Sequence, residues 1–433
     1  MFISRYSLQR WAKGLVCCAL AMILSCNLLS AQQLAADTLS LSLQQTEKKF
    51  IDSNFLLLAQ HYNVDAQRAL IEQAKVWQNP TLNTDFMLAA DGKILQYHKN
   101  ADGSFNGQYY IQVQQLILTA KKRGKLINLA TTNAHLSELQ LQDVLRNLRY
   151  QLHQDYYTIQ QQLALLAIYN GQAVQLSKLV AGMKAQLGAG NIAQKDYIRI
   201  QALSIALQQD MVELKKSIAD TQNDIKTLLQ IKSPNLFVKP LETLSSEATL
   251  PDNVDALINA ALRSNPSYLL QQAQITYQQQ SLEYQKALKT PDITLGPNFD
   301  RNSNFAPNYV GLGVSVPLPV FNKNKGNIKS AEANVKLQQA IALNAEAELR
   351  NNVSNAHQKL VLSIELNNAT QKEFYDSYTT LYNNMVESYK NRQINLLEFL
   401  DFFNDYTDSR KKLLDQQLNL QLAKEELAYY TNK

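Results

Sequence analysis

The side chains best suited to chemistry in this chain are two acids three residues apart, Glu398 and Asp401. Residues with this spacing share one face of a helix. If three copies of the chain turned that face into a tube, the carboxylates would form two stacked rings that favour cations and repel anions. Such rings could also hold a metal ion or form a constriction that responds to pH. The competing interpretation is an ordinary solvated helix face.

No other pattern in the sequence indicates a catalytic site. The five histidines are scattered, without carboxylates or cysteines at metal-ligand spacing: His61, His98, His135, His153 and His357. The sequence contains neither a glycine loop that would cradle phosphate nor a serine nucleophile elbow. We therefore expect that the protein is not an enzyme, and that it has no cofactor and no dedicated metal site.

The first 31 residues have the pattern of a secretory signal. Arg5, Arg10 and Lys13 precede the apolar run 14–29, and Ala31 offers a small residue for cleavage. The formal net charge of +5 falls to +2 without these three cations. A charge this small leaves no electrostatic footprint for nucleic-acid binding.

All three cysteines lie within this leader, so disulfides contribute nothing to the mature chain. Residues 23–26 loosely resemble a bacterial lipoprotein box, which would leave a lipidated Cys26 at the new N-terminus. Cleavage after Ala31 and lipidation of Cys26 both remain open, and either would take the chain out of the cytoplasm.

Two long runs without proline, 124–188 and 326–390, must position the acids. A helix spanning either run reaches about 95 Å. Apolar residues recur in these runs at the alternating spacing of four and three that holds a seam against a partner helix. They include Leu141, Leu145, Leu148, Leu152, Tyr156 and Ile159 in the first run and Phe374, Tyr378, Leu381 and Met385 in the second. The pattern predicts a helical rod, and a coiled coil with no further purpose is the simpler alternative.

The chain also repeats itself. A shift of 211 residues places Asn54 on Asn265 and Pro80 on Pro291, and a shift of 202 places Gly124 on Gly326. We therefore predict a first repeat at 32–231, a linker at 232–252 that contains three prolines, and a second repeat at 253–433. Each repeat is expected to hold a helix, a strand pair and a long helical hairpin, with hairpins at 121–231 and 325–430 and their tips near 187–192 and 389–394.

Four windows alternate between apolar and polar or small residues: 81–90, 108–118, 292–300 and 309–318. This period of two over about ten residues is typical of strands that span a membrane as part of a barrel. Two soluble hairpins packed on a core are the alternative. Lipid does not tolerate the two open edges that four strands leave, so several copies would have to pool their strands. Three copies would give twelve strands, and two copies would give eight.

The order of these features resembles the outer-membrane efflux protein (TolC-like) family over nearly the whole mature chain, most closely its heavy-metal branch. The shared motifs are Gln78-Asn79-Pro80 before the first strand, Pro317-Leu318-Pro319 after the fourth, and residues 394–401 after the second tip. The resemblance implies a mixed α/β membrane protein: a trimeric twelve-stranded β-barrel in the outer membrane on an α-helical tunnel through the periplasm. It also implies docking to a periplasmic adaptor protein and an inner-membrane pump of the resistance–nodulation–division (RND) type.

The same resemblance assigns Glu398 and Asp401 to a closed entrance at the periplasmic end. In the first repeat Asp196 matches Glu398, and Arg199 stands where Asp401 would fall. We hypothesise that Arg199 or Arg392 pairs with acids across the rod and keeps this entrance closed.

The two tips are the expected docking site for the adaptor, because the turn of a helical hairpin exposes unpaired backbone groups. Plain turns are the alternative. The candidate docking residues are Leu187, Gly188, Ala189, Gly190 and Asn191 in the first tip and Tyr389, Lys390 and Asn391 in the second.

The function predicted from these features is an outer-membrane channel of a tripartite efflux system, exporting small molecules or metal ions. A secreted coiled-coil or adhesin stalk without a pore is the alternative from another class. The four alternating windows distinguish the two, because a stalk has no need of strands with an apolar outward face. The sequence does not identify the exported substrate.

Overall fold

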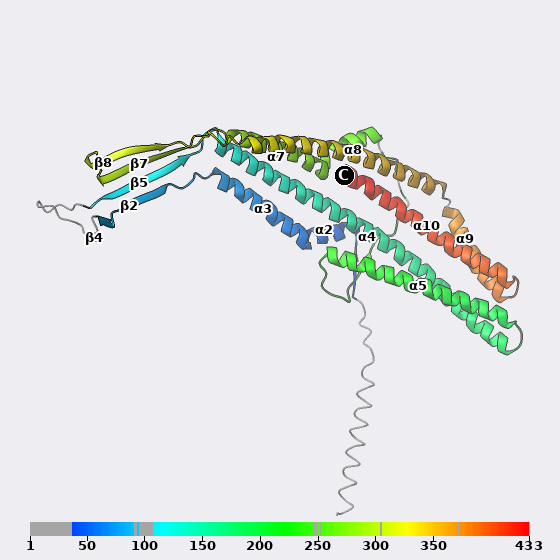
Figure 1. The fold of residues 1–433 in the computed structure, drawn as a ribbon. Helices are drawn as coiled ribbons and strands as arrows, with labels where there is room; N and C mark the ends of the chain where they lie inside the picture. The colour runs from blue at the N-terminus through cyan, green and yellow to red at the C-terminus, as the bar shows by residue number, and fades with distance from the viewer. Residues whose placement is uncertain are drawn as a thin grey trace, which may run out of the picture.

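The computed structural model describes residues 37–90, 93–94, 107–245, 247, 249–251, 253–303, 305–370 and 372–432. The leader and Cys26 lie outside these residues. The molecule is long and narrow, with a small sheet at one end, helices along its length, and two helical turns at the other end (Figure 1). No helix in the described part is both long enough and apolar enough to cross a membrane.

The elements follow the same order twice. The first series is β1 (Thr38–Leu41), α2 (Leu43–Ser53), α3 (Phe55–Lys75), β2 (Thr81–Phe86), β3 (Ala89–Ala90), β4 (Lys93–Ile94), β5 (Tyr109–Ile117), α4 (Lys122–Gly188) and α5 (Gln194–Leu228). The second is β6 (Phe237–Pro240), α6 (Val254–Ser264), α7 (Pro266–Ala287), β7 (Ile293–Asn302), β8 (Pro307–Ser315), α8 (Lys325–Ala369), α9 (Lys372–Lys390) and α10 (Leu396–Thr431). The chain is therefore a mixed α/β protein in which helix predominates.

The two proline-free runs fold differently. The first forms one helix, α4, whose 67 residues extend for about 100 Å. The second run is interrupted at Thr370, whose extended backbone ends α8 before α9 begins. The Thr370 hydroxyl donates to the carbonyl of Leu366 at 2.9 Å and accepts from the Gln416 side chain at 2.7 Å. Thr407 makes the same two kinds of bond within the continuous helix α10, so these contacts accompany the break but do not by themselves explain it.

The repeat is visible in a shared hydrogen-bonded junction, which we call the Ser-Asn buckle. In the first repeat Ser53 and Asn54 donate to the carbonyls of Leu229 and Leu228 at 2.9 and 3.0 Å. In the second repeat the equivalent pair donates to the end of α10 at the same distances: Ser264 to Thr431 and Asn265 to Tyr430. Each asparagine also caps the next helix and is almost fully buried. Each buckle thus ties the end of a return helix to the start of its own repeat.

The four main strands form one antiparallel sheet in the order β2-β5-β7-β8, so the two repeats meet at β5 and β7. One face carries a polar row in which Asn83, Gln112, Asn298 and Gly311 lie opposite one another. The other face is apolar, and Val310, Leu312 and Val314 on it are 62–74% exposed. Apolar side chains this exposed need a covering of lipid or protein.

A buried lysine fixes the junction between the sheet and the rod. The ammonium of Lys122, at the start of α4, is almost inaccessible and contacts an Asp292 carboxylate oxygen at 2.7 Å and the carbonyl of Thr290 at 2.6 Å. The Thr119 N–H donates to the same Asp292 oxygen at 2.8 Å. Because these contacts satisfy both charges, the end of β5 in the first repeat is locked to the start of β7 in the second.

Halfway along the rod, His153 of α4 lies between two carboxylates. Its ring nitrogens are each 2.6 Å from a carboxylate oxygen, Nε2 from Glu47 of α2 and Nδ1 from Glu425 of α10. Burial alone would lower the pKa of His153, but the hydrogen bonds and negative charges of Glu425 and Glu47 outweigh it and raise the pKa to about 9. The hydrogen bond from His153 lowers the pKa of Glu47 against the opposing effect of burial. A charged histidine therefore joins three helices.

We predict that His153→Gln destabilises the protein in a pH-dependent manner. A pKa raised from 6.5 to about 9 corresponds to about 3 kcal/mol of folding stability. This contribution is complete below about pH 6.5, provided Glu47 is ionised, and disappears as the pH rises through about 9. The measurement is thermal unfolding of both proteins, followed by helical circular dichroism between pH 5.5 and 9.5.

The exposed His135 supplies the control for this experiment. His135→Gln should shift the unfolding temperature little at any of these pH values. A His153→Gln deficit that stays constant from pH 5.5 to 9.5 would show that His153 acts by packing and not by charge.

Candidate functional site at the helical tips

The two tips have the same backbone. In the first, the amides of Ala189, Gly190 and Asn191 donate to carbonyls four, three and five residues earlier, at 3.1, 3.0 and 2.9 Å. The amides of Asn391, Arg392 and Gln393 make the same three bonds at 2.9, 3.0 and 2.8 Å. The sequences differ but the turns agree, because hydrogen bonding to the last helical carbonyls determines the shape.

One residue in each turn occupies the left-handed region, Gly190 with φ 75° and Arg392 with φ 60°. Glycine adopts this conformation freely, whereas a residue with a side chain is destabilised there by about 1 kcal/mol. Arg392 therefore holds the second tip in a strained conformation. A side chain kept at a position suited to glycine needs a compensating contact.

That contact crosses to the other tip. The Arg392 guanidinium donates to the side-chain oxygen of Gln186 at 2.6 Å, and the Tyr389 hydroxyl lies 3.7 Å from the sulfur of Met183. The Tyr389 ring also stacks on Phe399 of α10, with centroids 4.7 Å apart. These contacts fasten the second hairpin to the first at the end of the rod.

A cavity of about 560 Å³ lies between the fastened tips. Its lining includes apolar side chains such as Leu179 and Ile192. It also includes five of the predicted site residues: Asn191, Asp196, Tyr389, Lys390 and Arg392. The other tip residues that we singled out do not line it: Leu187 and Gly188 end α4, and Ala189, Gly190 and Asn391 belong to the turns.

The acids Glu398 and Asp401 lie away from this cavity, exposed on the first turns of α10. Glu398 is the third residue of the helix, and its N–H donates to the side chain of the capping residue Asn395 at 2.9 Å. Asp196 occupies the same position in α5. An acid in the first turn is favoured by the helix dipole, so the match between Asp196 and Glu398 has a structural explanation.

Asp401 has no such explanation. It is exposed, and within the described residues it forms no ion pair; the same is true of Glu398 and Arg199, and the half-buried Asp196 forms no ion pair either. The hypothesised pairing of Arg199 or Arg392 with acids across the rod is therefore not formed within a single chain, in which Arg392 contacts Gln186 instead.

The acidic face is longer than the pair from which we began. Asp405 and Asp408 are also exposed, and at 100° per residue all four acids fall within one quadrant of α10. Phe399, Phe403 and Tyr406 are buried on the opposite side. The spacing of three, four and three residues between the acids is visible in the sequence, so the two additional acids could have been found there.

The described residues contain no grouping of three or more His, Cys, Asp or Glu side chains that could hold a metal ion. The acidic face of one chain is thus a line of separate carboxylates. Chelation of a metal there requires side chains from more than one copy.

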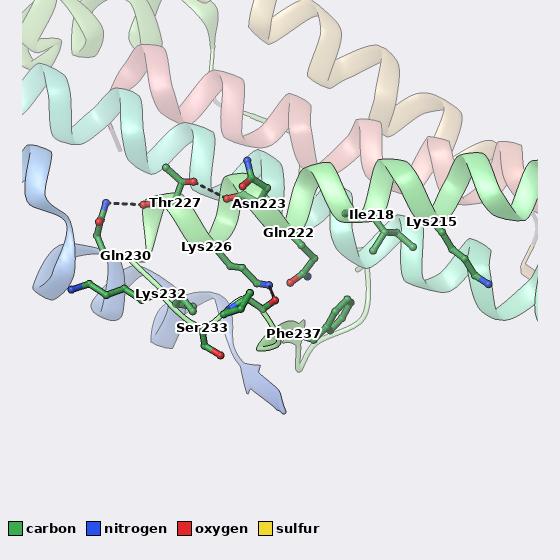
Figure 2. A pocket seen from close by; sticks show the side chains of 13 residues that line it. Lys215, Ile218, Gln222, Asn223, Lys226, Thr227, Gln230, Lys232, Ser233 and Phe237 are labelled. Carbon is green, nitrogen blue, oxygen red and sulfur yellow. Dashed lines mark hydrogen bonds between the residues drawn. The ribbon is translucent and has the colours of Figure 1, made fainter. Parts of the chain in front are cut away.

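A second hollow lies far from the tips, where α5 ends and the chain turns towards β6. This groove of about 740 Å³ has an apolar floor that includes Ile218 and Phe237, and its lining includes three lysines and no acid: Lys215, Lys226 and Lys232. Figure 2 shows Lys226 reaching the segment that follows α5, where it donates to the carbonyl of Pro234 at 3.0 Å. None of the predicted site residues line this groove.

A sheet with an exposed apolar face, continued by a helical rod about 100 Å long, defines a subunit of a membrane channel with a tunnel attached. The chain belongs to the outer membrane efflux protein family, whose pattern matches residues 48–229 and 257–433. It is accordingly an outer-membrane channel of a tripartite efflux system for small molecules or metal ions, not an enzyme, and the stalk without a pore is excluded.

Proteins of similar sequence or fold are known. The cobalt-zinc-cadmium resistance protein CzcC of Cupriavidus metallidurans is 21% identical over 81% of this chain and 80% of its own length. The structure of CusC, described as a transmembrane channel, covers 90% of this chain and 92% of its own, with a TM-score of 0.72 and 16% identity. The outer membrane channel CmeC of Campylobacter jejuni covers 90% and 85%, with a TM-score of 0.71 and 11% identity.

We predict that Arg392→Ala destabilises the second tip more than Arg392→Gly does. Arg392→Ala keeps the left-handed strain and loses the bond to Gln186, whereas Arg392→Gly loses the same bond but relieves the strain. A difference of about 1 kcal/mol makes hydrogen exchange of the Gln393 amide about fivefold slower in the glycine variant. Equal exchange rates in the two variants would show that the second tip carries no such strain.

Proposed function

We propose that three copies of this chain close a twelve-stranded barrel in the outer membrane and gather their rods into one tunnel. Support comes from the sheet, whose outer strands β2 and β8 each have one partner within the described chain. Such edges cannot remain open to lipid. In this arrangement each repeat, 32–231 and 253–433, contributes one strand pair and one helical hairpin, joined through 232–252.

We propose further that the tips receive a periplasmic adaptor, which connects the tunnel to an inner-membrane pump of the RND type. The cavity between the tips supports this, because it combines apolar walls with the polar groups of Asn191, Asp196 and Arg392. A helical hairpin presenting apolar and polar side chains has partners for both in such a cavity. The candidate docking residues around it are those at 187–191 and 389–391.

The entrance gate is assigned to the acidic face of α10, with Asp401 as its principal member and Glu398 beside it. Three copies would bring these side chains together as rings around the tunnel axis. Rings of carboxylates at a narrow point hold cations and repel anions. Asp196, Arg199 and Arg392 complete the proposed entrance at the level of the turns, where Arg199 would pair with an acid of a neighbouring copy.

We predict that Glu398→Ala combined with Asp401→Ala widens the entrance. Truncating the rings removes both bulk and bound cations, so single-channel conductance in a planar bilayer should rise by about twofold and the preference for cations should fall. Glu332→Ala with Glu348→Ala, two exposed acids on α8, is the matched control and should leave both properties unchanged. An unaltered conductance in the tip variant would remove Glu398 and Asp401 from the gate.

For the substrate we propose divalent metal ions, on the basis of the similarity to CzcC, whose name specifies resistance to cobalt, zinc and cadmium. Deletion of this gene from its host should raise sensitivity to these three ions. Sensitivity to dyes, detergents and antibiotics should be unchanged. If the deletion strain becomes sensitive to organic compounds and not to metals, the channel remains but the substrate assignment is wrong.

A further inference from the structure

Three glycines lie on the polar face of the sheet: Gly296 in β7, and Gly311 and Gly313 in β8. Glycine weakens a strand, and its presence within one often marks a place where another group approaches the backbone closely. The atoms nearest to the three glycines identify the approaching groups. They belong mainly to side chains of other residues, which lie against the sheet at these positions.

One amide side chain covers two of the glycines. A Cβ on Gly296 would lie 2.9 Å from Nε2 of Gln112, and a Cβ on Gly313 would lie 3.0 Å from the same atom. The Gln112 amide is fixed there because it donates to the carbonyl of Gly296 at 3.3 Å and accepts from the Gln114 side chain at 2.6 Å. Gln112 therefore lies flat along the sheet instead of projecting from it.

A tyrosine lies flat in the same way. A Cβ on Gly311 would lie 2.6 Å from the ring of Tyr309 and 2.7 Å from its hydroxyl, and 2.8 Å from the side-chain oxygen of Asn298. No real Cβ tolerates these distances, so the Tyr309 ring occupies space that only glycine leaves free. Any larger residue at position 311 displaces the ring from the wall.

The direction of that displacement follows from the two faces of the sheet. Gln112, Asn298 and Gly311 share a row, whereas Leu312 and Val314 point to the opposite, apolar face. In a membrane barrel the apolar face meets lipid and the polar face encloses water. A side chain that leaves its recess must therefore swing into the water-filled bore.

We propose that Gly296, Gly311 and Gly313 are recesses that keep the exit barrel wide by storing Gln112 and Tyr309 against its wall. The inference rests on the proposed barrel and adds an explanation for the width of its bore. The row of Tyr309 also carries two acids on the same face, Asp85 and Asp300, so the recesses set the width of the exit and not its charge.

The test compares Gly296→Ala and Gly311→Ala with wild type in planar bilayers, with polyethylene glycols of graded mass added on the outer side. Each variant should admit only smaller polymers, and conductance should fall by about twofold for Gly311→Ala, which displaces a whole ring. Adding Gln112→Ala to the first variant and Tyr309→Ala to the second should restore the wild-type cut-off. Gly326→Ala, with open space around its Cβ position, is the control.

The displaced side chain can also be observed directly. A cryo-EM structure of Gly311→Ala should place the Tyr309 ring in the bore, a result that does not depend on where conductance is limited. If the ring keeps its place and the polymer cut-off is unchanged, the recess proposal is overturned. If the wild-type structure shows no closed barrel, the proposed barrel fails first, so the two failures can be told apart.

Discussion

The unpaired edges of a four-stranded sheet are the constraint on which the rest of this molecule depends. Within the described chain, β2 and β8 each have a partner on one side only. The hydrocarbon core of a membrane offers no substitute for the missing hydrogen bonds. Strands of other copies must therefore pair with β2 and β8 to complete the sheet. The rods are continuous with the strands through α4 and α8, and any arrangement that closes the sheet also gathers the rods. The assembly that closes the sheet therefore also forms the tunnel.

Hydrogen bonds and stacked rings hold the rod together at the same level. Gln172 donates to Thr407 at 2.7 Å, and the neighbouring Tyr406 stacks on Tyr382 with centroids 4.1 Å apart. Hydrogen bonds are directional and fix the register of two helices, whereas stacked rings tolerate sliding at little cost. The end that is proposed to open is therefore held by directional bonds, including Arg392 to Gln186, as well as by rings.

Much of this architecture could be predicted from the sequence because its signals are local. The alternation of apolar and polar residues identifies the strand windows, and the match of Asn54 with Asn265 anticipates the repeated Ser-Asn buckle. The role of Glu398 beside a capping asparagine could not be read, because it depends on where α10 begins. The same limit applies to Gln112, because glutamine is common on any solvated surface. Only the register across β7 and β8 shows that this glutamine lies against two glycines.

The break at Thr370 also escaped prediction, because neither a proline nor a glycine marks it in the sequence. The repeated buckle has a different consequence. Each repeat closes on itself, with Ser53 and Asn54 bonded to the end of α5 and Ser264 and Asn265 bonded to the end of α10. A polypeptide of half this length already contains both halves of its own clasp. The pattern is what duplication of one self-closing unit would leave, and the linker at 232–252 then only has to join two units that each close alone.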